Sequence, residues 1–320
     1  MQVAFMKPDG TMDNALIYKR EILYTGMNGK HVERVYTSPD QSYIFKPLTN
    51  LEQHKLEGWI GANILPSIPG APAPRLLASS DDGVRPEESW LLYEDLGSLE
   101  HVFDVDTAAQ LAVSAARWHA LPCAHLRELP LRGPKPPVAQ LAAQLRRADS
   151  AAHARRLLQG MPAAHAERAL AVLEGTGSYS WEGLPDVLSH GDLHLGNYAK
   201  VNGAVKVMDW EHLHLNHPYW DLYHVIDLSH PSFPKNVTSE ARERILGAYA
   251  AEAEALGTLQ QSYMDFSRGY REFAVIFTMW MLQLIRSDLE RGSGPWPEEQ
   301  LRRQLGEAEA SLAQCVEDLL

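Results

Sequence analysis

The chain has 320 residues, of which 45% are hydrophobic and 22% are charged, a composition typical of a soluble globular protein. This length suffices for one large domain or for a protein of two lobes. Acidic residues outnumber lysine plus arginine by 41 to 29, which gives a formal net charge of −12. That balance argues against nucleic acid as a partner, because phosphate backbones are bound by basic surfaces.

The cysteine content and the apolar runs bear on the compartment. Two cysteines, Cys123 and Cys315, are too few for a disulfide framework or a cysteine-based zinc motif. Residues 1–10 lack the apolar core of a signal peptide, and no run of 18 apolar residues is available to span a membrane. We therefore expect a cytoplasmic protein without a membrane partner, either a monomer or a homodimer.

The N-terminal part reads as strands. Four runs alternate in the manner of half-buried strands, at residues 15–18, 21–24, 32–36 and 43–46. Asn28 and Gly29 favour a tight hairpin of type I′, and residues 38–40 favour a second turn. The pattern predicts an antiparallel sheet, followed by a helix over residues 51–65.

A loop and a further hairpin follow this helix. Residues 66–74 are rich in proline and glycine and mark the loop. The runs 75–78 and 90–93 predict the two strands of the hairpin. Residues 94–97 break the strand pattern, and Gly97 suits a boundary between domains.

The rest of the chain is mostly helical in pattern. From Asp106 onward, apolar residues recur near the helical spacing, and we predict helices through most of residues 134–177. After residue 238 we expect helices at 239–256, 259–291 and 297–319. The helix 259–291 is apolar on all sides, which indicates that it lies in the core.

Between these helical parts lies a polar motif. The segment 189–197 reads S-H-G-D-L-H-L-G-N, and the strand-like run 205–208 then ends at Asp209, within D-W-E. Asp192 and Asn197 therefore lie on a loop, and Asp209 lies at the end of the strand that follows. An acid near a hydroxyl can orient it for phosphoryl transfer, while a second acid and an amide oxygen can hold Mg²⁺ against nucleotide phosphates.

The pattern H-x-D-x-x-x-x-N followed by D-W-E resembles the aminoglycoside phosphotransferase and choline kinase family. Gly191 stands where protein kinases carry arginine, and Leu195 departs from the small residue or proline common at its position. The resemblance implies a two-lobed, protein-kinase-like α+β fold. It implies an antiparallel-sheet lobe at residues 1–97 that binds nucleotide, and a mainly helical lobe at 98–320 that binds the acceptor. ATP, or GTP in its place, and Mg²⁺ are the implied cofactors.

The resemblance also implies roles for the polar motif. Asp192 matches the catalytic base, and Asn197 and Asp209 match the magnesium ligands. Asp221 matches a further acid that braces the catalytic loop.

Residues of the N-terminal part receive roles in the same way. Lys46, at the end of its strand, matches the lysine that contacts the nucleotide phosphates. Glu57 is the preferred partner of this lysine on the following helix, and Glu52 is the alternative. The backbone groups of Glu94 and Leu96 match the hinge that receives the adenine.

Several polar residues keep more than one interpretation. His194 either contacts phosphate or holds the loop, and Glu211 is either a third metal ligand or faces the substrate or a neighbouring helix. The spacing of His212, His214 and His217 matches no zinc motif, which favours packing or hydroxyl recognition.

The expected reaction is phosphorylation of a hydroxyl group on a small molecule, which the acidic composition allows to be cationic. We expect an aminoglycoside-like antibiotic, with choline, ethanolamine, a sugar or another amino alcohol as the alternative. A protein kinase is disfavoured because no A-P-E segment follows Asp209. A non-catalytic nucleotide-binding or spore-coat-like structural protein is the alternative of another class. A catalytically dead protein is expected to lose one of four residues, and all four are present: Lys46, Asp192, Asn197 and Asp209.

Overall fold

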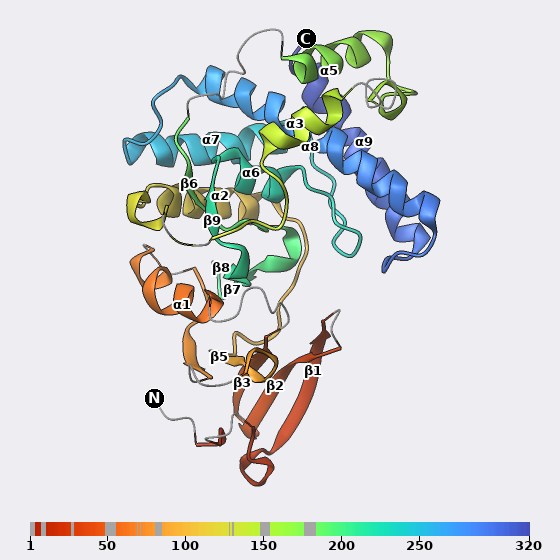
Figure 1. Cartoon of the computed structure of the whole chain (residues 1–320). Helices are drawn as coiled ribbons and strands as arrows, with labels where there is room; N and C mark the ends of the chain where they lie inside the picture. The colour runs from red at the N-terminus through yellow and green to blue at the C-terminus, as the bar shows by residue number, and fades with distance from the viewer. Residues whose placement is uncertain are drawn as a thin grey trace. The chain divides into compact units, whose positions relative to one another are not determined.

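The computed structural model describes residues 4–7, 11–26, 29–48, 56–68, 70, 72–80, 85–127, 129, 131–147, 154–175 and 184–320. The chain forms two compact units (Figure 1). The first, here called the sheet unit, comprises Met1–Glu100 and Lys200–Glu211. The second, here called the helical unit, comprises His101–Ala199 and His212–Leu320.

The sheet unit contains a five-stranded antiparallel sheet of order β1-β2-β3-β5-β4, which confirms the predicted architecture. Its strands are β1 (Lys19–Thr25), β2 (His31–Ser38), β3 (Gln41–Pro47), β4 (Leu76–Ser79) and β5 (Trp90–Glu94). The predicted turn at 38–40 is present, since Ser38 pairs with Gln41. The first hairpin joins β1 to β2 as predicted, but Asn28 lies outside the described residues.

The strand predicted at residues 15–18 is wrong. Asn14–Leu16 form the short 3-10 helix η1, and β1 begins only at Lys19. The Asp13 side chain accepts a hydrogen bond from the backbone N–H of Ala15 at 3.1 Å. Such a local side-chain acceptor competes with strand pairing and favours a helical turn.

One face of the sheet forms a small core. Val35 and Leu92 are fully buried there, next to Phe5 and Trp90. The helix α1 (Leu56–Asn63) packs against β4. Gly61 allows the close approach, because a Cβ atom at this position would lie 3.1 Å from the Leu76 side chain.

Helix α1 falls within the helix that we predicted at 51–65. Residues 51–55 lie outside the described residues, and the alternative partner Glu52 lies outside them as well. Short 3-10 turns accompany the other connections, at η3 (Leu65–Ser67), η4 (Pro86–Glu88) and η5 (Ala124–Leu126).

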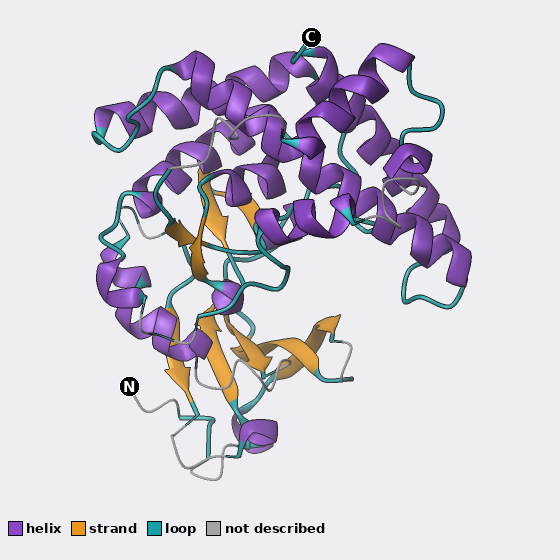
Figure 2. Ribbon diagram, turned by 45° about the horizontal axis from the view of Figure 1, so that its top comes forward, coloured by secondary structure: helices purple, strands orange, loops and turns teal. Residues whose placement is uncertain are grey.

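The helical unit confirms the predicted helical second part (Figure 2). Among the described residues its helices include α2 (Val105–His119), α3 (Val138–Arg146), α5 (Ala163–Glu174), α6 (Tyr219–Ile226), α7 (Ser239–Ala255), α8 (Tyr263–Arg291) and α9 (Glu298–Glu317). Helix α2 packs on α7, and α8 packs on α9. Phe273, Ile276 and Phe277 of α8 are fully buried, as expected from the apolar pattern of this helix.

Capping residues set the ends of these helices. Helix α8 starts at Tyr263, later than the predicted residue 259, because the Ser262 side chain accepts a hydrogen bond from the N–H of Asp265. Gly292 ends the same helix in the left-handed conformation, with φ of 61°.

Short strands carry the polar motif between the helices. In the helical unit β6 (Val187–Ser189) pairs with β9 (His214–Asn216), and the motif loop continues through the 3-10 turn η6 (Leu195–Asn197). The strands β7 (Tyr198–Val201) and β8 (Ala204–Val207) form a second pair, followed by the turn η7 (Trp210–His212).

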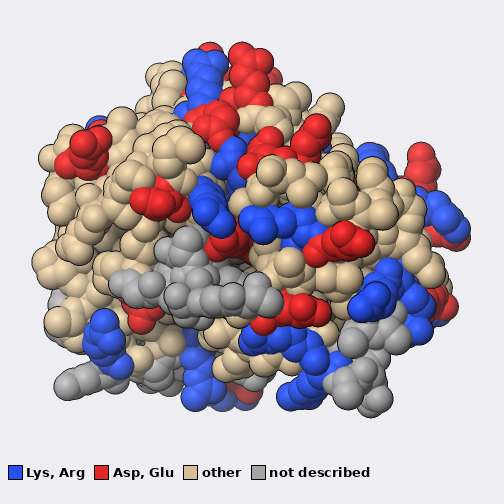
Figure 3. All heavy atoms as spheres, turned by 90° about the horizontal axis from the view of Figure 1, so that it is seen from above, with Lys and Arg blue, Asp and Glu red and all other residues tan. Residues whose placement is uncertain are grey.

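In the described part of the chain, no helix has both the length and the apolar character needed to cross a membrane. Basic and acidic side chains alternate on the face drawn in Figure 3, so the negative net charge is not gathered into one patch there.

Candidate active site

A charge cluster gathers in the sheet unit around Lys46. This residue lies on β3, whose pairing with β5 sets Lys46 opposite Leu91. Its Nζ donates to Glu57 Oε2 of helix α1 at 2.7 Å and to Asp209 Oδ1 at 2.5 Å. The structure therefore joins three of the residues predicted from the sequence in one set of contacts.

The cluster is buried enough for its charges to interact strongly. Burial lowers the pKa of the Lys46 ammonium, but Asp209 and Glu57 outweigh burial and raise this pKa well above its usual value. The opposite balance holds for Glu57, where burial raises the pKa despite the attraction of Lys46. Tyr93 donates its hydroxyl to Glu57 Oε1 at 2.9 Å and so fixes the second oxygen of this carboxylate.

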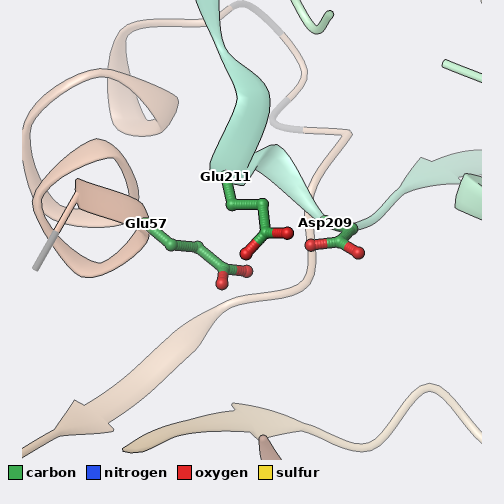
Figure 4. Close-up of side chains that lie close together, drawn as sticks. All are labelled: Glu57, Asp209 and Glu211. Carbon is green, nitrogen blue, oxygen red and sulfur yellow. The ribbon is translucent and has the colours of Figure 1, made fainter. Parts of the chain in front are cut away.

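A third acid, Glu211, completes the cluster. The carboxylate groups of Glu57, Asp209 and Glu211 face one another, and their ligand atoms lie within 4.8 Å of one another (Figure 4). Glu211 lies beside Glu57 of helix α1 and beside the candidate metal ligand Asp209, so its interpretation as a third metal ligand stays a prediction. Carboxylate oxygens are the donors that a hard divalent cation such as Mg²⁺ prefers, so these three acids form a candidate site for one.

The backbone at Asp209 is in an unusual conformation. Its φ is 62°, in the left-handed region that non-glycine residues seldom adopt. The preceding strand is anchored, because the N–H of Val207 donates to the Pro72 carbonyl at 2.8 Å. Trp210 Nε1 donates to the Val207 carbonyl at 3.1 Å and closes the turn after Asp209. Strained backbone of this kind is concentrated at functional sites.

The segment proposed as the hinge begins at Glu94, the last residue of β5. The Glu94 carboxylate accepts a hydrogen bond from the backbone N–H of Arg75 at 2.9 Å. Asp95 was not singled out from the sequence. Its carboxylate accepts hydrogen bonds from Arg34 Nε at 2.6 Å and from the N–H of Gly97 at 2.8 Å. Leu96 lies between these anchors, so side-chain contacts fix the path of the backbone around it.

In the helical unit, Asp192 lies among basic side chains. Lys135 Nζ donates to Asp192 Oδ1 at 3.0 Å, while His194 Nε2 lies 3.6 Å from Oδ2 and His224 Nε2 lies 3.8 Å from Oδ1. Burial raises the pKa of Asp192, but Lys135, His194 and His224 together hold this pKa well below its usual value. Asp192 is therefore a carboxylate at neutral pH.

Asp221 braces the loop that carries Asp192, as expected. It is fully buried and accepts hydrogen bonds from two side chains of α2 and from three groups of the loop. These donors are Trp118 Nε1, His119 Nε2, Ser189 Oγ and the backbone N–H groups of His190 and Gly191. A buried carboxylate with this many donors holds a single loop conformation.

Asn197 is bound to the same loop. Its Nδ2 donates to the backbone carbonyl of Asp192 at 2.8 Å, which fixes the spacing between the two motif residues. Asn197 belongs to the helical unit, whereas Asp209 belongs to the sheet unit.

Histidines of the motif have packing contacts. His194 Nδ1 accepts the N–H of Gly196 at 3.0 Å, and its ring stacks on His230 at 4.6 Å, which agrees with a role in holding the loop. His214 makes hydrogen bonds with Asn216 and with the His212 carbonyl. Other rings surround His217, which contacts Tyr219 and Phe273.

The sequence reasoning missed Lys135 altogether. Its side chain is 20% exposed and contacts Asp192 from the segment between α2 and α3. No spacing rule links it to the motif, which begins more than fifty residues later. The one signal in the sequence is a lone lysine between prolines, Pro134 and Pro136, in a chain rich in acids.

The model of the phosphotransferase enzyme family, APH, matches residues 62–261. The chain belongs to this family. This result confirms the resemblance seen in the sequence, and it makes a small-molecule phosphotransferase the supported class of activity. A comparison with curated protein sequences found no match.

Solved structures confirm the kinase-like α+β fold. The choline kinase of Cryptosporidium parvum is 12% identical, with a TM-score of 0.58 over 95% of this chain and 90% of that one. The macrolide 2'-phosphotransferase MphH of Brachybacterium faecium is 17% identical, with a TM-score of 0.56 over 92% of this chain and 93% of that one. The GDP and kanamycin complex of APH(2")-IIia is 12% identical, with a TM-score of 0.56 over 92% and 93% of the two chains.

Proposed function

We propose that this chain transfers the γ-phosphate of ATP to a hydroxyl group of a small molecule. The observation that carries the proposal is the double contact of Lys46 with Glu57 and Asp209. An ammonium held between a helix acid and the acid that follows a motif strand is the arrangement used to grip nucleotide phosphates and their metal.

On the nucleotide side, we assign residues 1–97 and the Asp209 segment to the donor. Lys46 contacts the phosphates, Glu57 orients Lys46, and the backbone of Glu94 and Leu96 receives the base. Asp209 and Asn197 hold Mg²⁺, with Glu211 as a further ligand supported by its place in the carboxylate cluster. The metal, when bound, neutralises charge on the β- and γ-phosphates. GTP is an alternative donor, because a solved relative in fold binds GDP.

On the acceptor side, residues 98–320 supply Asp192 as the catalytic base. Its carboxylate orients the acceptor hydroxyl, whose oxygen attacks the γ-phosphorus while the bond to the β,γ-bridging oxygen breaks and ADP leaves. The hydroxyl proton passes to Asp192 and then to solvent. A depressed pKa makes Asp192 a weak base, so its main contribution is orientation of the hydroxyl.

For the acceptor we propose an aminoglycoside-like antibiotic first, since solved proteins of the same fold act on macrolides or are complexed with kanamycin. A choline-type amino alcohol is the second candidate, supported by the similarity to a choline kinase. We place the reaction in the cytoplasm, where ATP is available and where free cysteines such as Cys123 and Cys315 stay reduced.

Thermal unfolding with nucleotide and metal tests the donor assignment. We expect ATP with Mg²⁺ to raise the melting temperature by several degrees, because a ligand at one hundred times its Kd stabilises by about 2.7 kcal/mol. ATP with EDTA is the control and should give a smaller shift. An unchanged melting temperature at millimolar nucleotide and metal would contradict the proposal. Nucleotide consumption with aminoglycosides, macrolides, sugars and choline then identifies the acceptor.

A further inference from the structure

Lys135 and His224 form a pair beside the proposed catalytic base. Lys135 Nζ lies 3.0 Å from Asp192 Oδ1 and 3.2 Å from His224 Nε2. The His224 ring is fully buried, whereas the Lys135 side chain is 20% exposed and the Asp192 side chain is 23% exposed. Lys135 is thus held by the buried ring of His224 on one side and by the partly exposed carboxylate of Asp192 on the other.

The hydrogen bonds of His224 fix its tautomer. Nδ1 lies 2.7 Å from the backbone carbonyl of Trp220, which can only accept, so Nδ1 carries the proton. Nε2 therefore has a lone pair and accepts a hydrogen bond from the Lys135 ammonium at 3.2 Å. Burial and the charge of Lys135 lower the pKa of His224 to about 3, so the ring is neutral at pH 7.

The backbone around Lys135 is restricted before any ligand binds. Lys135 lies between Pro134 and Pro136, and a residue that precedes proline is confined to extended conformations. Gly133 lies against the ring of His214, so closely that a Cβ atom there would be 2.5 Å from Nε2. The segment 133–137 is therefore held against strand β9, and little conformational entropy is lost when Lys135 makes its contacts.

We propose that Lys135 is a positioning residue of phosphoryl transfer: anchored by neutral His224, its ammonium holds Asp192 through Oδ1 and turns Oδ2 toward the acceptor hydroxyl. The inference rests on the proposed function. Among the described residues, no hydrogen bond reaches Oδ2 of Asp192, and His194 Nε2 lies 3.6 Å from it, too far for a hydrogen bond. Oδ2 is thus the oxygen available to a hydroxyl.

The charge of Lys135 has a second effect on the reaction. An isolated carboxylate would repel the phosphate oxygens that approach the acceptor. An ammonium at 3.0 Å from this carboxylate makes the pair neutral overall and reduces that repulsion. A neutral side chain of the same length would keep the packing but lose this effect.

Chemical rescue separates charge from packing. We would replace Lys135→Cys in a Cys123→Ser background, since Cys315 is 1% exposed and protected from reagents. The folded protein is then treated with 2-bromoethylamine, which restores an ammonium at lysine length, or with iodoacetamide, which adds a neutral amide. The readouts are ATP consumption with water as the acceptor and with the antibiotics and amino alcohols named above, and Mg-ATP affinity by calorimetry.

We expect the cysteine variant to lose about 10- to 100-fold in turnover at unchanged nucleotide affinity, and only the ammonium adduct to recover most of the loss. Equal recovery by the amide adduct, undiminished turnover in the cysteine variant, or faster turnover in it would overturn the proposal. Failure of the parent protein to bind Mg-ATP would instead count against the proposed function.

His224 provides a readout that does not depend on turnover. Nitrogen-15 spectra of the histidine rings at pH 7, assigned with a His224→Gln variant, should show neutral His224 with the proton on Nδ1. A proton on Nε2 would exclude the contact with Lys135 that the proposal needs. His224→Gln keeps a hydrogen-bond acceptor for Lys135, whereas His224→Phe keeps none. Turnover should therefore be higher in His224→Gln than in His224→Phe.

Discussion

Lys46 and Lys135 are both held by carboxylates, and their surroundings differ. Lys46 in the sheet unit lies in a cluster with Glu57, Asp209 and Glu211, so acids outnumber the lysine. Lys135 in the helical unit faces Asp192 and a neutral histidine, so one positive charge balances one negative charge. The first cluster favours an additional cation, and the second suits a neutral hydroxyl group.

The two lysines are also held in place differently. The hydrogen-bonded register of β3 and β5 fixes the backbone of Lys46. Lys135 is held instead by proline neighbours and by the close packing of Gly133 on His214. Strand pairing fixes the backbone position of Lys46 for almost any neighbouring residues in the sequence. The position of Lys135 in its loop depends instead on a few specific residues.

The largest effect is expected at the cluster rich in acids. Asp209→Ala removes a proposed metal ligand and leaves Lys46 with one partner fewer, so we expect turnover to fall about 10³-fold or more. The stabilisation by Mg-ATP over ATP alone should vanish as well. Both are measurable by nucleotide consumption and thermal unfolding.

Lys46→Met is the matched comparison for this variant. It removes the proposed phosphate contact but leaves the carboxylates, so it should weaken nucleotide affinity while Mg²⁺ still enhances binding. Turnover near the parent level in Asp209→Ala would show that the metal lies elsewhere.

The second prediction concerns the balanced pair. Asp192→Asn keeps the size of the side chain but cannot orient or accept the proton of the hydroxyl as a carboxylate does. We expect turnover to fall about 10²- to 10⁴-fold, with Mg-ATP affinity by calorimetry nearly unchanged. If turnover stayed intact while binding was normal, the base would have to be sought at His194 or Glu211.

These two sites also differ in how far the sequence predicted them. Lys46, Glu57 and Asp209 were named through the resemblance to the kinase family, which implies a lysine at the end of a strand, its acid on the next helix and a motif acid. Their meeting in one cluster agrees with the fold that the motif implied. Lys135 follows no local rule, because its contact with Asp192 depends on how the segment before α3 packs on the motif.

The fold shows the same division. The antiparallel sheet and the helices α7, α8 and α9 were predictable, since long periodic patterns reflect which face is buried. The strand expected at 15–18 failed because one side-chain hydrogen bond from Ala15 to Asp13 decided the local backbone. Single contacts of this kind carry no periodic signal.

The third prediction tests the brace beneath Asp192. Burial raises the pKa of Asp221, but His119 and His190 outweigh it and hold this pKa well below its usual value. A carboxyl with a depressed folded pKa stabilises the protein above its unfolded pKa of about 3.9, and this stabilisation is lost as pH falls. Asp221→Asn should therefore cost about 3 kcal/mol at pH 7 and less at pH 3.

Denaturant unfolding at pH 7, 5 and 3 measures this difference. The parent should lose stability more steeply than Asp221→Asn between pH 5 and pH 3. A constant gap between the two proteins at all three pH values would mean that Asp221 keeps its usual pKa in the folded state.

The smallest expected effect concerns the packing that positions Lys135. In Gly133→Ala the new methyl group would lie 2.5 Å from the His214 ring, so the ring or the segment must shift. The ring is not easily displaced, because Nδ1 is hydrogen-bonded to the His212 carbonyl at 2.8 Å and Nε2 is hydrogen-bonded to Asn216 Nδ2 at 2.9 Å. We expect a loss of about 1–3 kcal/mol in the free energy of unfolding and a several-fold loss of turnover.

Gly306→Ala is the matched control for this substitution. Gly306 lies in helix α9, where a Cβ atom would meet nothing within 4 Å, so alanine should stabilise the helix by up to about 1 kcal/mol. Turnover should not change in this control. If Gly133→Ala behaved like Gly306→Ala, the close packing on His214 would not be what holds the segment. If it lost stability but kept full turnover, Lys135 would tolerate displacement, and its contact with Asp192 would not set the rate.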